Sequence, residues 1–513
     1  MDGTGGWYGW LGRGQRRRDE PFKPRPAERP PVFVNRLPNP VRLTILGIGL
    51  ALARAGLVDR SRVDRTVDLA WPRIYTGLAR MSKSAIDVAM VGIAVGPAAI
   101  AGVGFASPYW GLTFTLGAGL ATGTIALVSQ RYGADAFDQL GQAVRSSVLL
   151  VLLGSVALAA VVAAVPTPLV DVLTDDPRSI ELGATYLQLL ALGMPFAAAN
   201  LVGSRILIGA DDAWIPMVLR GSGAVANVVL NAVLIFGLGM GVAGAALGTA
   251  ISNAVIAVAF AVGLVRGGLP GIGAFPVRVD LRGPYAHRET IGDLVRISLP
   301  ATGRRFVWTV ARFPMLAFVA LFGQPVVAAY VISRRIWALI NTPGWGYGLA
   351  ASSLVGQSLG EDDEGLAEVY GHEIARIAVL TYVVFAGFVL VFAEPIVRLF
   401  VRDPVGNTVP VAVALVHAAA LAVIARGIGG TYAGALEATG DTRWPFYSRI
   451  VGMFVLGIPL TYLGATTPLG LWGLYLSYFG QSLAPAVVNY YRFATGKWKA
   501  ISRQYRPESA TAR

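Results

Sequence analysis

The sequence has no cysteine, only three histidines, and few charged residues for a chain of 513 residues. Without cysteine there is no disulfide framework and no thiolate-ligated metal. His287, His372 and His417 are scattered and show no metal-binding spacing. Charged residues make up 14% of the chain, whereas soluble domains carry about 25%, so a soluble globular enzyme is excluded. No Gly-Lys-Ser/Thr phosphate loop occurs, and nothing indicates that ATP drives the protein.

Apolar residues are the largest class in the sequence. They make up 54% of the chain, and the mean hydropathy is +0.58. This composition is typical of a polytopic helical membrane protein, for which the lipid bilayer is an obligatory partner. Hydrophobic runs long enough to cross a bilayer recur twelve times. The predicted spans are 69–93, 97–128, 140–165, 183–208, 214–237, 241–265, 294–321, 326–357, 371–393, 408–433, 445–463 and 469–491.

The two halves of the chain resemble each other. Gln130 and Gly133 correspond to Gln357 and Gly360 at a shift of 227 residues, and five further marks recur in the same order at nearly the same shift. An even number of spans per copy keeps both copies in the same orientation. The predicted fold class is therefore all-α, with twelve transmembrane helices in two pseudo-symmetric six-helix lobes around a central cleft.

The excess of positive charge, +13, lies in the N-terminal tail and in alternate loops. This pattern indicates membrane orientation rather than a nucleic-acid partner, and it predicts a multi-pass protein of the cell membrane with both termini in the cytoplasm. The predicted cytoplasmic loops carry Arg131, Arg145, Arg205, Arg220, Arg266, Arg278, Arg282, Arg288, Arg296, Arg443 and Arg449.

The chain divides into five predicted parts. Residues 1–65 form a basic cytoplasmic tail. Its apolar run near 41–58 has about 16 apolar residues, too few to cross a bilayer, and is expected to be an interfacial helix. The other parts are an N-lobe at 66–266, a cytoplasmic linker at 267–292, a C-lobe at 293–494 and a cytoplasmic tail at 495–513.

One acidic residue, Asp87, lies deep in a predicted span. A charge at the centre of a spanning helix costs about 2.5–3.5 kcal/mol on insertion scales, so an ionisable residue there is a candidate functional residue. The structural alternative is an ion pair with Lys83, one turn earlier on the same helix face. We favour function, because a purely structural ion pair in lipid would be a net burden.

Amide and hydroxyl side chains accompany this carboxylate in neighbouring spans. Asn227 and Asn231 lie one turn apart on one helix face, and Thr249 lies in the next span. Interhelical hydrogen bonding is the structural alternative. Together with Asp87 they form an all-oxygen set suited to Na⁺ or to a proton relay. The second half has Leu456, Leu460 and Tyr478 at the matching positions.

Several cations also lie in predicted spans. Arg80 and Lys83 are in the first span, and Arg305 and Arg312 are in the seventh. Arg312 is the repeat counterpart of Lys83, and two cations related by a pseudo-twofold axis are expected to face the central cleft. A basic cleft would favour an anionic substrate. The alternative is that these side chains extend to the membrane interface.

From about residue 69 to 490, the chain resembles the multidrug and toxic compound extrusion (MATE) family of secondary transporters. The resemblance depends on Pro72, Asp87-Val-Ala-Met-Val-Gly92, Gly119, Ser129-Gln130-Arg-Tyr-Gly133-Ala134, Ile208-Gly209-Ala-Asp-Asp-Ala-Trp-Ile-Pro216, Asn227 to Phe236, and Gly241-Val-Ala-Gly-Ala-Ala-Leu-Gly-Thr249.

This resemblance implies two lobes in a V and export of small, amphiphilic organic molecules, driven by entry of Na⁺ or H⁺ with no other cofactor. The archaeal branch related to DNA-damage-inducible exporters uses an acid, an Asn and a Thr that match Asp87, Asn227 and Thr249. That branch has a second acid where this chain has Asn231. A monomer is expected.

Two other functions are weighed. A flippase for lipid-linked precursors would share the fold, and the basic residues support it. A membrane-embedded transferase would need an Asp-Asp-x-x-Asp motif, which neither Asp211-Asp212 nor Asp362-Asp363 completes.

Overall fold

The computed structural model describes residues 39–280, 282–398 and 408–506, apart from the side chains at 81, 82, 84, 85, 97 and 324. The described chain is helical except for one two-stranded hairpin. In this part of the chain, seven helices are long and apolar enough to cross a membrane, or up to eight if one bent pair is a single span. The other four predicted spans correspond to helices that are less apolar or interrupted.

The first half forms one bundle, the N-lobe, in which long helices run back and forth. Its elements are α2 (Arg60–Val95), α3 (Pro97–Gly133), α4 (Phe137–Ala164), α5 (Pro166–Asp171), α6 (Pro177–Ala191), α7 (Met194–Gly209), α8 (Trp214–Ala232), the π-helical η2 (Val233–Gly237) and α9 (Gly241–Arg266).

The second half forms a second helical bundle, the C-lobe. Its elements are α10 (Arg288–Val310), α11 (Arg312–Ala320), α12 (Gln324–Ile340), α13 (Thr342–Gly360), α14 (Glu364–Arg398), α15 (Thr408–Ala438), α16 (Arg443–Ile450), the π-helical η3 (Val451–Gly457), α17 (Ile458–Thr466) and α18 (Leu471–Ala494).

Three predicted spans are broken helices in the structure, and each break lies beside a proline. Proline lacks an N–H and its ring clashes with the preceding turn, so a helix bends or restarts there. Pro195 opens α7, which is bent by 50° from α6. Pro314 lies in the first turn of α11, and Pro343 lies in the first turn of α13. The predicted spans concerned are 183–208, 294–321 and 326–357.

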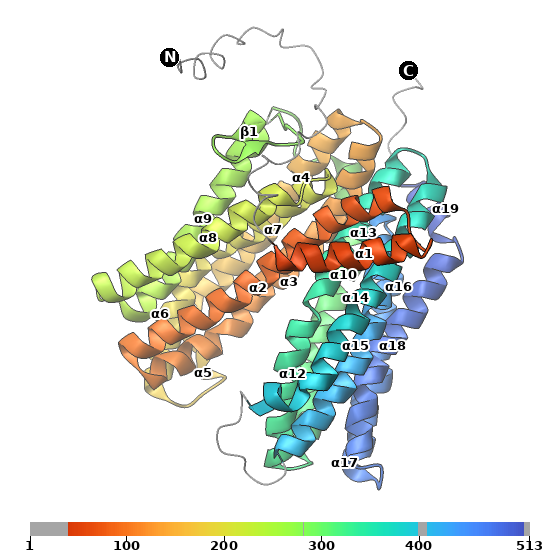
Figure 1. Ribbon diagram of the computed structural model, residues 1–513. Coiled ribbons are helices and arrows are strands. Elements are labelled where there is room, and N and C mark those ends of the chain that lie inside the picture. The colour runs from red at the N-terminus through yellow and green to blue at the C-terminus, as the bar shows by residue number, and fades with distance from the viewer. Residues whose placement is uncertain (1–38, 281, 399–407, 507–513) are drawn as a thin grey trace, which may run out of the picture.

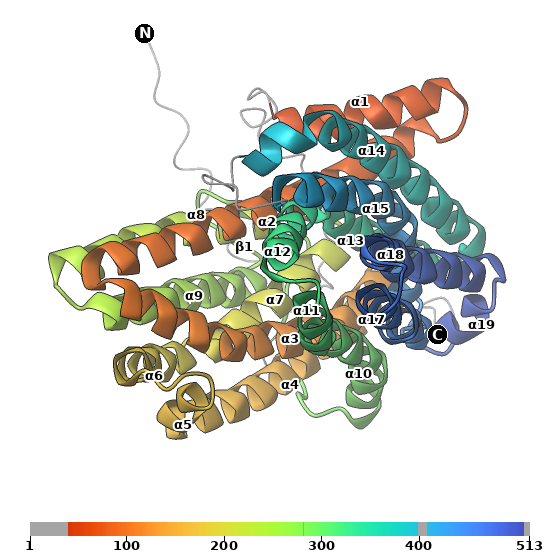
Figure 2. The ribbon, with the colours of Figure 1, turned by 90° about the horizontal axis from the view of Figure 1, so that it is seen from below.

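The lobes contact each other at one end and diverge toward the other (Figure 1). The contacting end carries the hairpin of β1 (Gly268–Leu269) and β2 (Gly273–Ala274) and the short helix α19 (Trp498–Ser502). The diverging end carries α5 and α17. Seen from that end, N-lobe and C-lobe helices occupy separate sides of the molecule (Figure 2).

Glycines of the sequence repeat make the contact between the lobes. A Cβ at Gly133 would overlap the carbonyl oxygen of Gln357, and a Cβ at Gly360 would overlap that of Gln130. These are the residues that correspond at a shift of 227. The backbones of α3 and α13 therefore cross in a pseudo-symmetric contact that admits no side chain. The Gln130 amide also donates to the Ala438 carbonyl at 2.6 Å.

The helix α1 (Pro40–Arg54) lies outside the two lobes, against α2 and α14. Asn39 caps it by accepting from the N–H groups of its first turn. Ile45, Ile48 and Leu52 are buried on its inner face. Its role as an interfacial helix stays a prediction.

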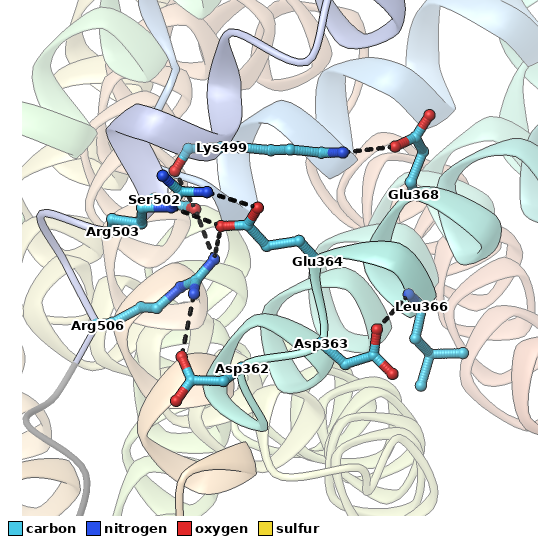
Figure 3. Close-up of polar contacts among 9 residues, drawn as sticks. All are labelled: Asp362, Asp363, Glu364, Leu366, Glu368, Lys499, Ser502, Arg503 and Arg506. Atoms are coloured by element: carbon cyan, nitrogen blue, oxygen red, sulfur yellow. Dashed lines mark hydrogen bonds and ion pairs between the residues drawn. The ribbon is translucent and has the colours of Figure 1, made fainter.

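Ion pairs attach the C-terminal segment to the start of α14 (Figure 3). Arg503 and Arg506 both contact Glu364, at 2.8 and 2.6 Å. Arg506 also reaches Asp362 at 3.0 Å, and Lys499 reaches Glu368 at 2.7 Å. Asp362 and the acids in the first turns of α14 therefore hold residues 499–506 against the C-lobe.

Candidate functional site

Asp87 lies in the second half of α2 and joins two partners from different elements. One carboxylate oxygen accepts from the Asn231 amide at 2.9 Å, and the other contacts the Lys83 ammonium at 2.6 Å. The side chain is 18% exposed. The Asp87 carboxylate thus makes both contacts that the sequence offered as alternatives. It accepts from Asn231, a predicted coupling residue, and it forms the ion pair with Lys83.

The hydrogen bonds continue from this carboxylate into the N-lobe. The Asn231 amide also donates to Asn227 Oδ1 at 3.3 Å, because the two side chains are one helical turn apart. The Asn227 amide donates to Thr249 Oγ1 at 3.2 Å and to Ser252 Oγ at 3.1 Å. All four predicted coupling residues belong to this one series of hydrogen bonds. Ser252, three residues after Thr249, is the member that the sequence interpretation missed.

One acceptor in this chain is unused. Asn231 Oδ1 is buried and has no hydrogen-bond partner among the described residues. It lies against Gly248, where a Cβ would overlap it, so only glycine leaves room for this amide. A small cation would find oxygen ligands at Asp87, Asn227 and Thr249, but the Lys83 ammonium and the Asn231 amide group now contact the carboxylate.

A second group of charges lies between the lobes. We call it the arginine cluster. For example, Arg73 and Arg205 of the N-lobe are close enough to Arg305 of the C-lobe for their charges to interact. Among the described residues the cluster comprises Arg73, Arg80, Arg205 and Arg220 of the N-lobe, and Arg304, Arg305, Arg334, Arg426 and Arg449 of the C-lobe.

Tryptophan rings hold several of these guanidinium groups. Trp345 lies 5.7 Å from Arg73 and 5.5 Å from Arg80, and it belongs to the opposite lobe from both. Arg334 lies 4.9 Å from Trp308 and 4.6 Å from Trp337. Each distance is within the range of cation–π attraction.

The structure corrects how the sequence assigned several cations. Arg205, Arg220 and Arg449, predicted in loops, lie within α7, α8 and α16. Of the predicted cleft residues, Arg80 and Arg305 join the cluster. Lys83 instead pairs with Asp87, and Arg312 is exposed at the start of α11 near Arg334.

Two related helical lobes, a partly buried carboxylate in one of them and a charged cluster between them are features of a secondary transporter. The MatE family model matches residues 72–233 and 300–463. The chain therefore belongs to the MatE family: it is a membrane efflux transporter driven by cation antiport and not an enzyme.

Named relatives and solved structures agree with this assignment. The chain is 27% identical to the multidrug resistance protein PmpM of Pseudomonas aeruginosa, covering 85% of this chain and 92% of that one. It is 27% identical to a probable multidrug resistance protein NorM of Rhodopseudomonas palustris, covering 86% and 93%.

Among solved structures, a MATE transporter in a bent conformation aligns with a TM-score of 0.79 at 23% identity, covering 87% of this chain and 97% of that chain. A MOP superfamily transporter from Pyrococcus furiosus, described as having a binding pocket of reversed polarity, aligns at 0.77 and 23%, covering 85% and 96%. The predicted all-α, two-lobed membrane fold is confirmed.

Proposed function

We propose that this exporter couples transport to a cation through Asp87, and that alternating access carries small organic molecules out of the cell. The observation that carries the proposal is the hydrogen-bonded chain from Asp87 to Thr249. It places a titratable group inside a lobe, where a change of charge alters the packing of α2 against α8. A coupling ion shifts the two states only by its differential affinity for them.

We infer that the contacting end of the lobes faces the cytoplasm. The basic residues Arg266, Arg278, Arg282 and Arg288 flank the hairpin at that end, which fits the positive-inside rule. The described ends of the chain, α1 and α19, lie at this end too (Figure 1). The structure then corresponds to the outward-open state, in which Asp87 is on the extracellular half of α2.

Protonation suits this site better than Na⁺. A proton on Asp87 removes the attraction to Lys83 and needs no new ligand. Binding of Na⁺ would require Lys83 to withdraw and the Asn231 amide to turn its oxygen inward. The match of Asp87, Asn227 and Thr249 supports placement in the archaeal branch related to DNA-damage-inducible exporters, with Asn231 in place of its second acid. The transporter acts as a monomer.

Reconstitution in proteoliposomes tests the proposal. Under an imposed pH gradient, Asp87→Asn should lose gradient-driven efflux by about a hundredfold, a loss of the size expected when an essential titratable group is removed. It should still insert as a monodisperse protein. Glu181→Gln is the matched control, because Glu181 is an exposed acid paired with Arg178. Normal gradient-driven efflux by Asp87→Asn would refute the assignment.

A second candidate is a flippase for lipid-linked precursors, and the arginine cluster favours it. A basic site between two lobes suits an anionic head group as well as a free organic anion. The two candidates share one fold and differ in the ligand that the cluster accepts.

A further inference from the structure

We propose that the arginine cluster is the substrate site, and that it binds an organic anion carrying a phosphate or diphosphate group beside an apolar body. This proposal rests on the transport function above and names its class of substrate. It differs in the sign of the charge from a site for cationic drugs.

The balance of charge in the cluster is the first argument. Nine arginines converge, and Glu437 is the one acid that the described residues place among them, already paired with Arg304. Unneutralised charges removed from water are costly, and inside a membrane protein they mark sites for ligands or ions. Bound anionic substrate would neutralise this excess.

Unsatisfied donors are the second argument. Arg205 is only 6% exposed, and its Nη1 has no hydrogen-bond partner among the described residues. Buried polar atoms are almost always paired in native proteins, so several orphaned donors in one place indicate a missing acceptor. The same holds for Arg73 Nε, Arg220 Nη1, Arg305 Nε and Arg449 Nη1.

The chemistry of these donors selects the ligand. A guanidinium group offers two parallel N–H donors that match two oxygens of a phosphate. The five orphaned donors come from five helices of both lobes. Arg73, Arg205, Arg220 and Arg305 interact with one another, and Arg449 is linked to them through Arg304. So many donors suit a multivalent anion better than a single carboxylate. A small cavity beside Arg73 and Arg220 is also lined by the hydroxyl-bearing Thr76 and Ser204.

The aromatic residues select an apolar body. Trp345, Trp308 and Trp337 lie against the arginines within cation–π distance. Phe114 lies 5.5 Å from Arg80 on the N-lobe side. A ligand whose anionic end meets the arginines thus meets aromatic surface immediately beside them.

The site also spans the two lobes, which gives the anion a role in the transport cycle. Arg73 of α2 and Arg205 of α7 repel Arg305 of α10 across the lobe contact. A bound phosphate or diphosphate offsets this repulsion and therefore favours the conformation in which both sets surround it. Release then follows when the lobes separate them again.

The direct test measures binding to the full chain in nanodiscs. Geranyl diphosphate, inorganic diphosphate and decaprenyl diphosphate are the anionic probes. Tetraphenylborate and tetraphenylphosphonium form a pair of equal bulk and opposite charge. We expect geranyl diphosphate to bind more tightly than inorganic diphosphate, and tetraphenylborate to bind at least tenfold more tightly than tetraphenylphosphonium. Binding of geranyl diphosphate indicates a free organic anion; binding of decaprenyl diphosphate alone indicates a lipid-linked one.

Substitutions locate the site. Arg205→Gln and Arg449→Gln, one from each lobe, should each weaken binding of the preferred diphosphate at least tenfold. Arg205→Lys should weaken it less, because the charge stays and the paired donors are lost. Arg178→Gln is the control, since Arg178 is exposed and outside the cluster. Thermal shift in the presence of diphosphate, measured on each variant, separates lost binding from misfolding, because a bound ligand stabilises only a folded protein.

Failure here is distinguishable from failure of the coupling role. Asp87→Asn should bind the diphosphate normally and lose only gradient-driven transport. Preference for tetraphenylphosphonium, or no binding of any diphosphate, would overturn the anionic substrate and leave the coupling proposal intact.

Discussion

The two lobes have the same helix arrangement but different side chains in their interiors. In the N-lobe a carboxylate, two amides and a hydroxyl form a continuous hydrogen-bonded chain. A shift of 229 residues places three leucines and a tyrosine at the matching positions of the C-lobe. A duplicated bundle can thus keep its helix packing while only one copy retains a titratable site. The pairs are Asp87 and Leu316, Asn227 and Leu456, Asn231 and Leu460, and Thr249 and Tyr478.

The C-lobe interior is packed rather than polar. Met315, Val319 and Ile458 belong to its large apolar cluster, and the Tyr478 hydroxyl lies 2.6 Å from Ser333 Oγ in a closed pair. Nothing in that arrangement changes charge near neutral pH. We infer that the C-lobe acts as a body against which the N-lobe moves.

Exchanging residues between the interiors should have the largest effect. Asn231→Leu gives the N-lobe the residue of the C-lobe and removes the amide that donates to Asp87. We expect gradient-driven efflux to fall at least tenfold. Leu460→Asn, the reciprocal change, should leave efflux within twofold. Equal losses in the two variants would contradict the division of roles between the lobes.

At the contact between the lobes, by contrast, matching substitutions in the two lobes should have equal effects. Gly133→Ala and Gly360→Ala each place a Cβ on a carbonyl oxygen of the other lobe. Both should reduce transport several-fold and to a similar degree, because the closed contact is lost in either case. Gly387→Ala, whose Cβ meets nothing within 4 Å, is the control. Accessibility of a cysteine introduced at the contact would report the opening, and unequal effects would mean that the two glycines are not equivalent.

The sequence predicted which polar residues lie together inside the N-lobe better than it predicted the residues that meet between the lobes, for a physical reason. Asn227 and Asn231 share a helix face by spacing alone, and a single acid stands out in an apolar run. Each cleft arginine looks ordinary by itself. Arg205 lies four residues before the end of α7 and Arg220 lies six residues after the start of α8, where charges normally meet the membrane interface. Only the crossing of the lobes brings them together, and no local pattern encodes that crossing.

A second acid in the N-lobe should have a smaller effect on transport, through the choice of coupling ion. Asn231→Asp introduces a second carboxylate beside Asp87. Two carboxylates can ligate Na⁺, whereas one carboxylate paired with Lys83 suits a proton. We expect efflux by this variant to depend on a Na⁺ gradient several-fold more than that of the unmodified protein. An unchanged Na⁺ response, with pH-driven efflux intact, would count against a role for the missing acid.

The smallest effect concerns two acids in matching loops, Asp212 and Asp441. Burial raises the pKa of Asp212 from 3.8 to about 6, and no cation of the described residues pairs with it; it accepts from the Ile215 N–H at 2.9 Å. Asp441, its counterpart at a shift of 229, forms an ion pair with Arg492 at 2.6 Å. Burial also raises the pKa of Asp441, so the charged form is a burden at both positions, but only at Asp441 does an ion pair offset part of that cost.

The pH dependence of Asp212 follows from linkage. Since its pKa is higher in the folded protein, folding retains a proton between about pH 4 and pH 6, and stability falls as the pH rises through that window. The penalty is absent below it and complete above it. Asp212→Asn keeps the acceptor for Ile215 and removes the charge. It should raise the melting temperature by about 2–5 °C at pH 7.5, with the difference closing by pH 4. Asp441→Asn should lower the melting temperature at pH 7.5, because Arg492 loses its partner. If both variants shifted in the same direction, the two loops would not differ as their contacts indicate.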